Sequence, residues 1–408
     1  VDKNKKLLPV FITVSNIQSS SPTRVRKGNE RVLNARLADA QFFWENDKKH
    51  SLEIGKHRLK EVLFHRSLGT LEDKTKRLKS LSIEVANMLS VNSVPCSRAA
   101  DLCKADLVTG MVGEFPELQG IMGQYLAKNS NEVKAVSEAI GEHYLPRYSG
   151  DRLPKTKPGT ILSLVDKLDT LTGLFLINEE PTGEKDPHGL RRLSLGIIRI
   201  LIEKKIPLDI EILVRMCAQS YSAHLGIENK EAILKTTAFI TERYRTIYSA
   251  RGFMLDEISA VVAIRPTQPL DIDYRLKAIK RFRRGKHANS LISGYKRVHN
   301  ILKKNTELKN SILNTHLFVD PSEIALSKAL ERTQKLVQPS LETGNYSKAL
   351  GELAKLRTEV DNFFDSVMVL DNDTEVRINR FALLLNLVAL FNSIADFSLL
   401  STPEQIHE

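Results

Sequence analysis

The spacing of apolar residues predicts a mainly helical protein. Over most of the 408 residues, apolar side chains recur at helical intervals, as on the buried face of an amphipathic helix, and turn-forming segments separate these stretches. Only Phe11 to Val14 has the β-branched and aromatic residues typical of a strand. We therefore expect a multi-domain helical protein with a short β-containing N-terminal segment. The helices should span residues 30–46, 57–66, 68–89, 97–112, 116–127, 131–144, 158–175, 187–204, 208–224, 228–250, 255–263, 270–284, 288–304, 321–341, 346–367 and 374–396.

The segment from Pro181 to Arg192 contains the clearest helix-start signal. Asp186 can cap a helix whose first position is Pro187, where a missing backbone N–H has no cost. The residues that follow are apolar on most sides, so this helix should be buried. Its arginines, Arg192 and Arg199, then need partners, which nearby acids inside the protein could supply.

Positive charge is concentrated in one segment of the chain. The formal net charge is +11, and the segment between Arg275 and Lys304 contains eleven Lys or Arg residues and no Asp or Glu. These cations are Arg275, Lys277, Lys280, Arg281, Arg283, Arg284, Lys286, Lys296, Arg297, Lys303 and Lys304. Such a segment attracts a polyanion, most simply RNA or DNA. The alternative is a solvated helix face that acids elsewhere in the fold compensate.

The same segment is amphipathic. Leu291, Tyr295, Val298 and Leu302 follow one helical stripe, and Lys296, Arg297, Lys303 and Lys304 lie off it. One helix can therefore dock on a core and present its cations outward.

Composition narrows the classes of function. A hydrophobic fraction of 42% and a charged fraction of 27% are typical of a globular protein. No apolar run is long enough for a transmembrane helix, and no secretion signal is present. Because the chain begins with Val, we expect a further N-terminal part to be missing. Cys96, Cys103 and Cys217 form no CxxC pair, which fits a cytoplasmic protein and argues against a disulfide framework or a zinc ribbon.

One pattern in the first half of the chain resembles the HD-type phosphohydrolase domain. The resemblance rests on Cys103 to Leu107, His143-Tyr144 and Asp166 to Asp169. That family holds a divalent metal with histidines and aspartates, but here Ala105 replaces the histidine of its His-Asp dyad. We therefore expect an HD-like fold without hydrolase chemistry or metal, with Asp106, His143 and Asp166 as degenerate positions. Asp106 should cap a helix or pair with a base such as Lys104.

Longer motifs resemble the β subunit of bacterial glycyl-tRNA synthetase over essentially the whole chain. They are Gly28–Val32, Arg36–Phe43, Leu68–Thr75, Phe115–Gly123, Val165–Asp169 and Pro181–Arg192, and Lys74, Asp186, Arg191 and Arg192 are candidate functional residues within them. Residues from Tyr346 to Leu400 resemble a DALR-type anticodon-binding domain. There Arg377 is a candidate for tRNA binding, whereas Arg380 should pair with Asp361 or Asp365 inside the bundle.

The resemblance implies a division of labour. The family is a heterotetramer with a pair of α chains and a pair of β chains, and the α chain would hold ATP and magnesium. This agrees with the absence of GxxxxGK[ST] and GxGxxG motifs here. We expect a tRNA-binding chain with no cofactor or catalytic residue of its own, no membrane partner, and no activity alone.

The expected domains follow from the breakers and motifs. Residues 1–56 would be the last part of an upstream domain, and residues 57–205 would form the HD-like domain. A connecting helical region, 206–268, would join it to residues 269–408, which hold the basic helices and the anticodon-binding bundle. A metal-dependent HD phosphohydrolase and a non-catalytic helical scaffold remain alternatives.

Overall fold

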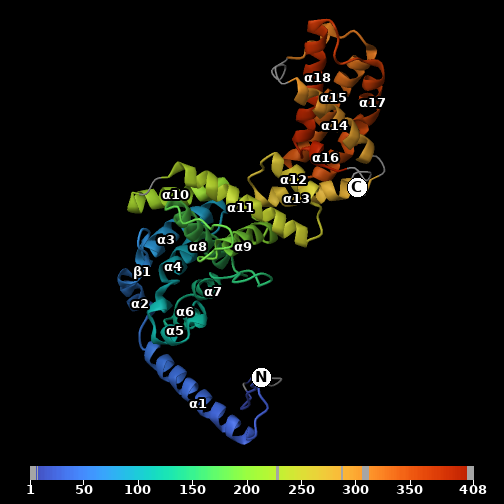
Figure 1. Cartoon of the computed structure of the whole chain (residues 1–408). Helices are drawn as coiled ribbons and strands as arrows, with labels where there is room; N and C mark the ends of the chain where they lie inside the picture. The colour runs from blue at the N-terminus through green and yellow to red at the C-terminus, as the bar shows by residue number, and fades with distance from the viewer. Residues whose placement is uncertain (1–5, 7, 227–228, 286–287, 306–311, 402–408) are drawn as a thin grey trace.

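The computed structural model describes residues 6, 8–226, 229–285, 288–305 and 312–401, and it is almost entirely helical (Figure 1). Its strands in the described part are β1 (Leu63–His65) and β2 (Gly69–Thr70), which form one short antiparallel hairpin. The mainly α fold class is confirmed. The strand expected at Phe11 to Val14 is wrong, because this run has no strand beside it and stays exposed. No helix of the described residues is long and apolar enough to cross a membrane.

Helix α1 (Pro22–Asp47) projects from the lower end of the molecule (Figure 1). It begins earlier than expected because Pro22 occupies the start of the helix. Among its residues only Asp47 is buried. The Asp47 carboxylate accepts hydrogen bonds from the backbone N–H groups of Gly110 and Met111, at the start of α5 (Gly110–Glu114). The helix is thus anchored to the body at its C-terminal end.

Helices α2 to α9 form the body that the sequence predicts to be HD-like, with α8 at its centre; we call it the HD-like body. The bounds are α2 (Leu52–Arg58), α3 (Leu71–Met88), α4 (Ser93–Leu102), α6 (Ile121–Asn129), α7 (Lys134–Glu142), α8 (Lys157–Leu176) and α9 (Leu190–Glu203). Almost every residue of α8 is buried, because α3, α4, α7, α9 and two later helices surround it. Such burial explains why its sequence is apolar on all sides.

Several helix boundaries differ from expectation. The single helix expected at 97–112 is divided into the end of α4, a 3-10 turn at Ala105–Val108 and α5. The helix expected at 57–66 is wrong over most of that range, because α2 ends at Arg58 and the chain enters the hairpin at Leu63. Gly69, whose φ of +86° favours glycine, begins the second strand. Helix α9 begins at Leu190, three residues after Pro187. Asp186 still caps it, because its carboxylate accepts from the N–H groups of Leu190 and Arg191.

The arginines of α9 have different environments. Arg199 pairs with Glu203 at 3.1 Å and donates to the carbonyl oxygen of Asp151, so internal pairing holds for this residue. Arg192 is exposed and forms no ion pair with any described residue. The apolar face is buried as expected, with Ile197 and Ile200 fully covered.

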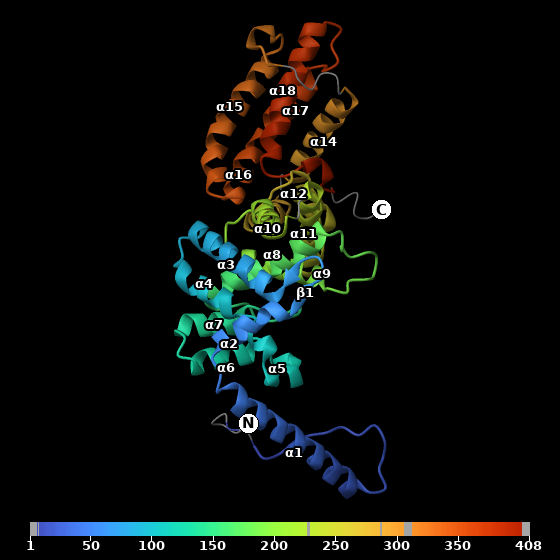
Figure 2. The same ribbon diagram turned by 90° about the vertical axis from the view of Figure 1, so that its left-hand side faces the viewer.

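The second half of the chain leads to a bundle at the opposite end from α1 (Figures 1 and 2). Its helices are α10 (Ile210–Leu225), α11 (Lys230–Ala250), α12 (Leu255–Ala263), α13 (Pro269–Phe282), α14 (Ala288–Lys304), α15 (Pro321–Glu342), α16 (Tyr346–Leu353), α17 (Arg357–Ser366) and α18 (Thr374–Asn392). The single helix expected at 346–367 is divided by a 3-10 turn at Ala354–Leu356. The break allows both α16 and α17 to contact α15.

Candidate nucleic-acid interface and a buried ionic network

The basic segment does not form one free cationic surface. Arg275 pairs with Asp271 at 2.7 Å and donates to the carbonyl oxygens of Ser393 and Ile394. Arg283 pairs with Asp256 at 2.9 Å and reaches Glu257 and the carbonyl oxygen of Ser401. These guanidinium groups join α13 to its neighbours. They are therefore unsuited to hold RNA, and the alternative of compensation by acids applies to them.

Two lysines of α13 are intermediate cases. Lys277 is exposed but pairs with the buried carboxylate of Asp273 at 2.6 Å. Lys280 donates to the carbonyl oxygen of Gly252 and lies 4.2 Å from the centre of the Phe253 ring. Both ammonium groups would have to give up an internal partner to bind a phosphate.

Five of the remaining cations face outward. Arg281, Arg284, Lys303 and Lys304 are exposed and form no ion pair within the described chain. Arg297 is also exposed, with its guanidinium 4.2 Å from the centre of the Phe364 ring. The expected docking stripe of α14 is confirmed, since Leu291, Tyr295, Val298 and Leu302 are buried. Lys296 is half-buried with a contact of its own, and Lys286 lies outside the described residues.

Arg377 and Arg380 of α18 both bind groups within the bundle. Arg380 is buried as expected, but its partners are Glu323 at 2.8 Å and Asp371 at 2.6 Å, not Asp361 or Asp365. The interhelical partner Glu323 belongs to α15, where it also completes a capping box with Asp320. Half-buried Arg377 donates to the carbonyl oxygen of Asp371 and to Thr374, so it supports the turn before α18.

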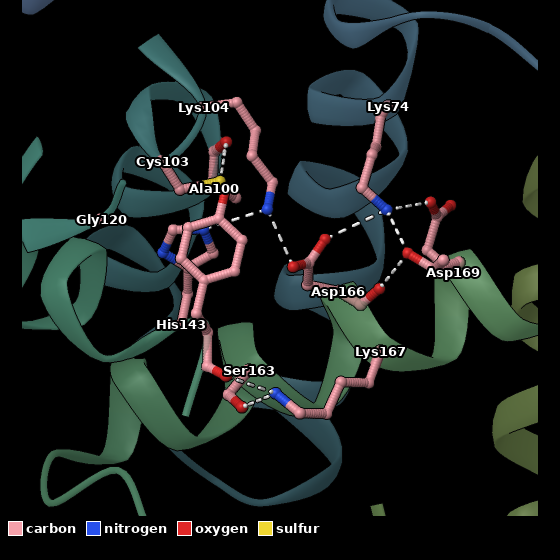
Figure 3. A network of polar contacts seen from close by, with 12 residues as sticks. Lys74, Ala100, Cys103, Lys104, Gly120, His143, Ser163, Asp166, Lys167 and Asp169 are labelled. Atoms are coloured by element: carbon pink, nitrogen blue, oxygen red, sulfur yellow. Dashed lines mark hydrogen bonds and ion pairs between the residues drawn. The ribbon is translucent and has the colours of Figure 1, made fainter. Parts of the chain in front are cut away.

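A buried ionic network crosses the HD-like body (Figure 3). The ammonium of Lys104 lies 2.9 Å from Asp166 and 3.0 Å from the ring nitrogen Nε2 of His143. It also sits 4.0 Å from the centre of the Tyr144 ring. From the other side, Lys74 of α3 approaches Asp166 at 3.0 Å. One carboxylate of α8 is thus held between two buried cations.

The network continues one helical turn along α8. Asp169 is fully buried and accepts from Lys74 at 2.9 Å and from Arg77 at 2.8 Å. Tyr221 of α10 joins it, accepting from Arg77 and donating to Asp169. The family motif pointed to Lys74, but the sequence reasoning missed Arg77 and Tyr221. The spacing could have indicated the network, because Lys74 and Arg77 lie three residues apart on α3, as Asp166 and Asp169 do on α8.

Opposite charge sets the protonation states in the network. Burial alone would raise the pKa of Asp166, but the attraction of Lys104 and Lys74 outweighs it and holds that pKa far below its ordinary value. Burial and the charge of Lys104 keep the pKa of His143 well below its ordinary value, so its ring is neutral. Its Nδ1 faces the carbonyl oxygen of Ile140 at 2.6 Å and carries the proton, which leaves Nε2 to accept from Lys104.

The HD-like positions gather around an internal cation. The Asp106 carboxylate accepts from the N–H groups of Gly120 and Gly123 at 2.6 and 2.9 Å, so it caps α6 as expected. His143 and Asp166 meet across the ammonium of Lys104, which occupies the space between them. In the described ranges, no three His, Cys, Asp or Glu residues are placed to hold a metal ion. The arrangement can join helices, but it offers no open coordination position.

The buried ammonium group of Lys167 should make the stability of the fold depend on pH. Its ammonium donates to the carbonyl oxygen of Leu145 and to Ser163, and burial lowers its pKa from 10.5 to about 7 despite the attraction of Asp166. Between these values the unfolded chain binds the proton and the folded chain does not, so stability rises with pH. Relative to Lys167→Met, the native chain should gain about 1–2 kcal/mol between roughly pH 6.5 and 8.5. Urea unfolding at both pH values measures this, with exposed Lys128→Met as control. Parallel pH profiles of the native chain and Lys167→Met would contradict the assignment.

Comparison with known proteins identifies the family. Residues 1–263 match the model described as glycyl-tRNA synthetase beta subunit, and residues 291–406 match the DALR anticodon binding domain, which therefore begins before Tyr346. The glycine–tRNA ligase beta subunit of Coxiella burnetii (strain RSA 331) is 46% identical over 401 residues, which cover 98% of this chain and 58% of the relative. Those of Erwinia tasmaniensis and Acinetobacter baumannii (strain ACICU) are 44% and 43% identical, with the same coverage. The chain spans 58% of the length of these curated relatives. Because the family model covers more than half of it, the chain belongs to the glycyl-tRNA synthetase beta subunit family.

Proposed function

We propose that this chain is the tRNA-binding β subunit of a glycine–tRNA ligase and recognises glycine tRNA through the anticodon arm and the phosphate backbone. One observation carries the proposal. The helices that match an anticodon binding domain present Arg297, Lys303 and Lys304 to solvent, and Arg281 and Arg284 are exposed at the C-terminal end of α13. Family membership and the names of the relatives support the substrate.

The α subunit would carry out the chemistry in this proposal. ATP and magnesium would bind there, in a cytoplasmic heterotetramer with a pair of α and a pair of β chains. This chain would contribute no catalytic residue and would be inactive alone. Its own task would be to hold tRNA in position, because binding energy at remote parts of a substrate is what orients its reacting end.

The HD-like body would then serve as a rigid support. Lys104 joins α7 and α8 through His143 and Asp166, and Lys74 joins α3 to the same carboxylate. An ammonium group in this place favours a structural role over metal-dependent hydrolysis. No observation favours the phosphohydrolase or the scaffold alternative.

Binding of glycine tRNA at several salt concentrations tests the proposal. Fluorescence anisotropy would compare native tRNA with a copy whose anticodon is replaced. If roughly four to six phosphates are neutralised, log K falls against log salt with a slope of about −3 to −5. Tighter binding of the native anticodon and this steep slope would support recognition. Equal binding of both would leave only a phosphate-gripping surface, and no binding would contradict the proposal for this chain.

A further inference from the structure

A groove runs between α15 and α18 in the anticodon-binding bundle. Its volume is about 280 Å³, enough for a nucleobase. One wall carries Glu331, Gln334 and Gln338, which are spaced i, i+3, i+7 and therefore share one face of α15. Asn386 of α18 lies on the facing wall, and leucines from both helices form the apolar part of the lining.

The polar lining selects an uncharged, hydrogen-bonding ligand. Among the described residues no Lys or Arg lines the groove, and the Glu331 carboxylate would repel a phosphate. Glu331 forms no ion pair, and the amides of Gln334 and Asn386 form no hydrogen bond, with other described residues. Gln338 is already engaged, since it donates to Glu342 at 2.9 Å. One free carboxylate and two free amides are thus available to a base edge.

A stripe of cations follows the neighbouring face of the same helix. Lys328, Arg332 and Lys335 are spaced i, i+4, i+7, are exposed, and form no ion pair within the described chain. With 3.6 residues per turn, this stripe lies about a quarter of a turn around α15 from Glu331 and Gln334. Phosphates gripped by the stripe would leave their bases within reach of the groove. The sequence reasoning missed this stripe, because Glu331 and uncharged residues separate its cations along the chain.

We propose that this groove binds one cytosine of the glycine anticodon, while the stripe of Lys328, Arg332 and Lys335 holds the adjoining phosphates. Glycine codons begin with a pair of guanines, so the anticodon carries a pair of cytosines. Cytosine offers its N4 amino group to the Glu331 carboxylate and accepts at N3 and O2 from the amides of Gln334 or Asn386. Uracil presents an oxygen in place of the amino group, which the carboxylate repels. The inference rests on the proposed function.

The test compares cytosine and uracil at each of the two anticodon positions. The whole 408-residue chain is titrated by fluorescence anisotropy at one salt concentration. The ligands are native glycine tRNA and, for each anticodon position, a copy in which uracil replaces the cytosine. At one position the native chain should bind the cytosine form at least about tenfold more tightly. Glu331→Ala should bring this ratio close to one, and Gln334→Ala should lower it partly. Alanine favours a helix, so the fold should survive, and a melting curve verifies this.

Glu375→Ala is the matched control. Glu375 is an exposed acid of α18, and eleven residues, or about 16 Å of helix, separate it from Asn386. Glu375→Ala changes the net charge by the same amount as Glu331→Ala, but it should leave the ratio of affinities for the cytosine and uracil forms unchanged. A ratio that survives Glu331→Ala, or a native chain that does not discriminate, would overturn the groove assignment while leaving tRNA binding intact. Failure to bind either tRNA would overturn the proposed function as well.

Discussion

Asp169→Ala should lower the free energy of unfolding by about 3–5 kcal/mol, because it leaves the buried Arg77 without its carboxylate and Lys74 with Asp166 alone. Asp169 is fully buried and accepts from Arg77 and Lys74, whose side chains are 0% and 3% exposed. After the substitution Arg77 would keep only the hydroxyl of Tyr221 and the carbonyl oxygen of Leu68. A buried, incompletely paired guanidinium is costly, and the removed carboxylate also leaves a cavity.

Urea unfolding followed by circular dichroism measures this loss. The control is Glu72→Ala, which removes the partner of Lys76 from a surface pair on α3, the helix that also carries Lys74 and Arg77. Such a pair contributes only about 0.5 kcal/mol or less. If both substitutions cost the same small amount, the network would not hold the HD-like body together.

Reversing Arg281 and Arg284 to Glu should weaken tRNA binding by about tenfold to a hundredfold near 0.1 M salt. Both guanidinium groups are exposed without an internal ion pair, so they can neutralise phosphates at no cost to the fold. The slope of log K against log salt should become shallower by about two. Anisotropy titrations across salt concentrations measure both quantities.

The neighbouring residue Arg283 supplies a contrast. Arg283→Glu would face Asp256 and Glu257, its present partners, and should lower the melting temperature. Lys348→Glu with Lys355→Glu changes the net charge by the same amount, on α16 and on the 3-10 turn that follows it. If that pair weakens binding as much as the reversal on α13, net charge alone and no particular surface would explain the attraction to tRNA.

Local signals in the sequence were enough to predict most helices. The helices at 255–263 and 288–304 were predicted with the bounds that the structure shows. Apolar spacing and capping residues act over a few positions, so they can be read along the chain. The strand predicted at Phe11 to Val14 failed for the opposite reason, since a strand needs a neighbour that local composition does not supply.

The candidate interface was predicted only in outline. Concentrated charge drew attention to α13 and α14, but Arg275 is engaged by carbonyl groups of Ser393 and Ile394, and Arg283 by Asp256, all distant in the sequence. The stripe on α15 was missed because helical spacing, and not proximity along the chain, gathers its cations.

By itself, the sequence determined the helical class, the family motifs and the residues that start and end most helices, because each depends on patterns repeated over a few turns. Tertiary structure alone decided which cations are free, which acids neutralise the others, and where a groove lies. Lys104 illustrates the difference, since its meeting with His143 and Asp166 joins residues from separate helices. Charge pairing depends on distance in space, and only the packed helices set that distance.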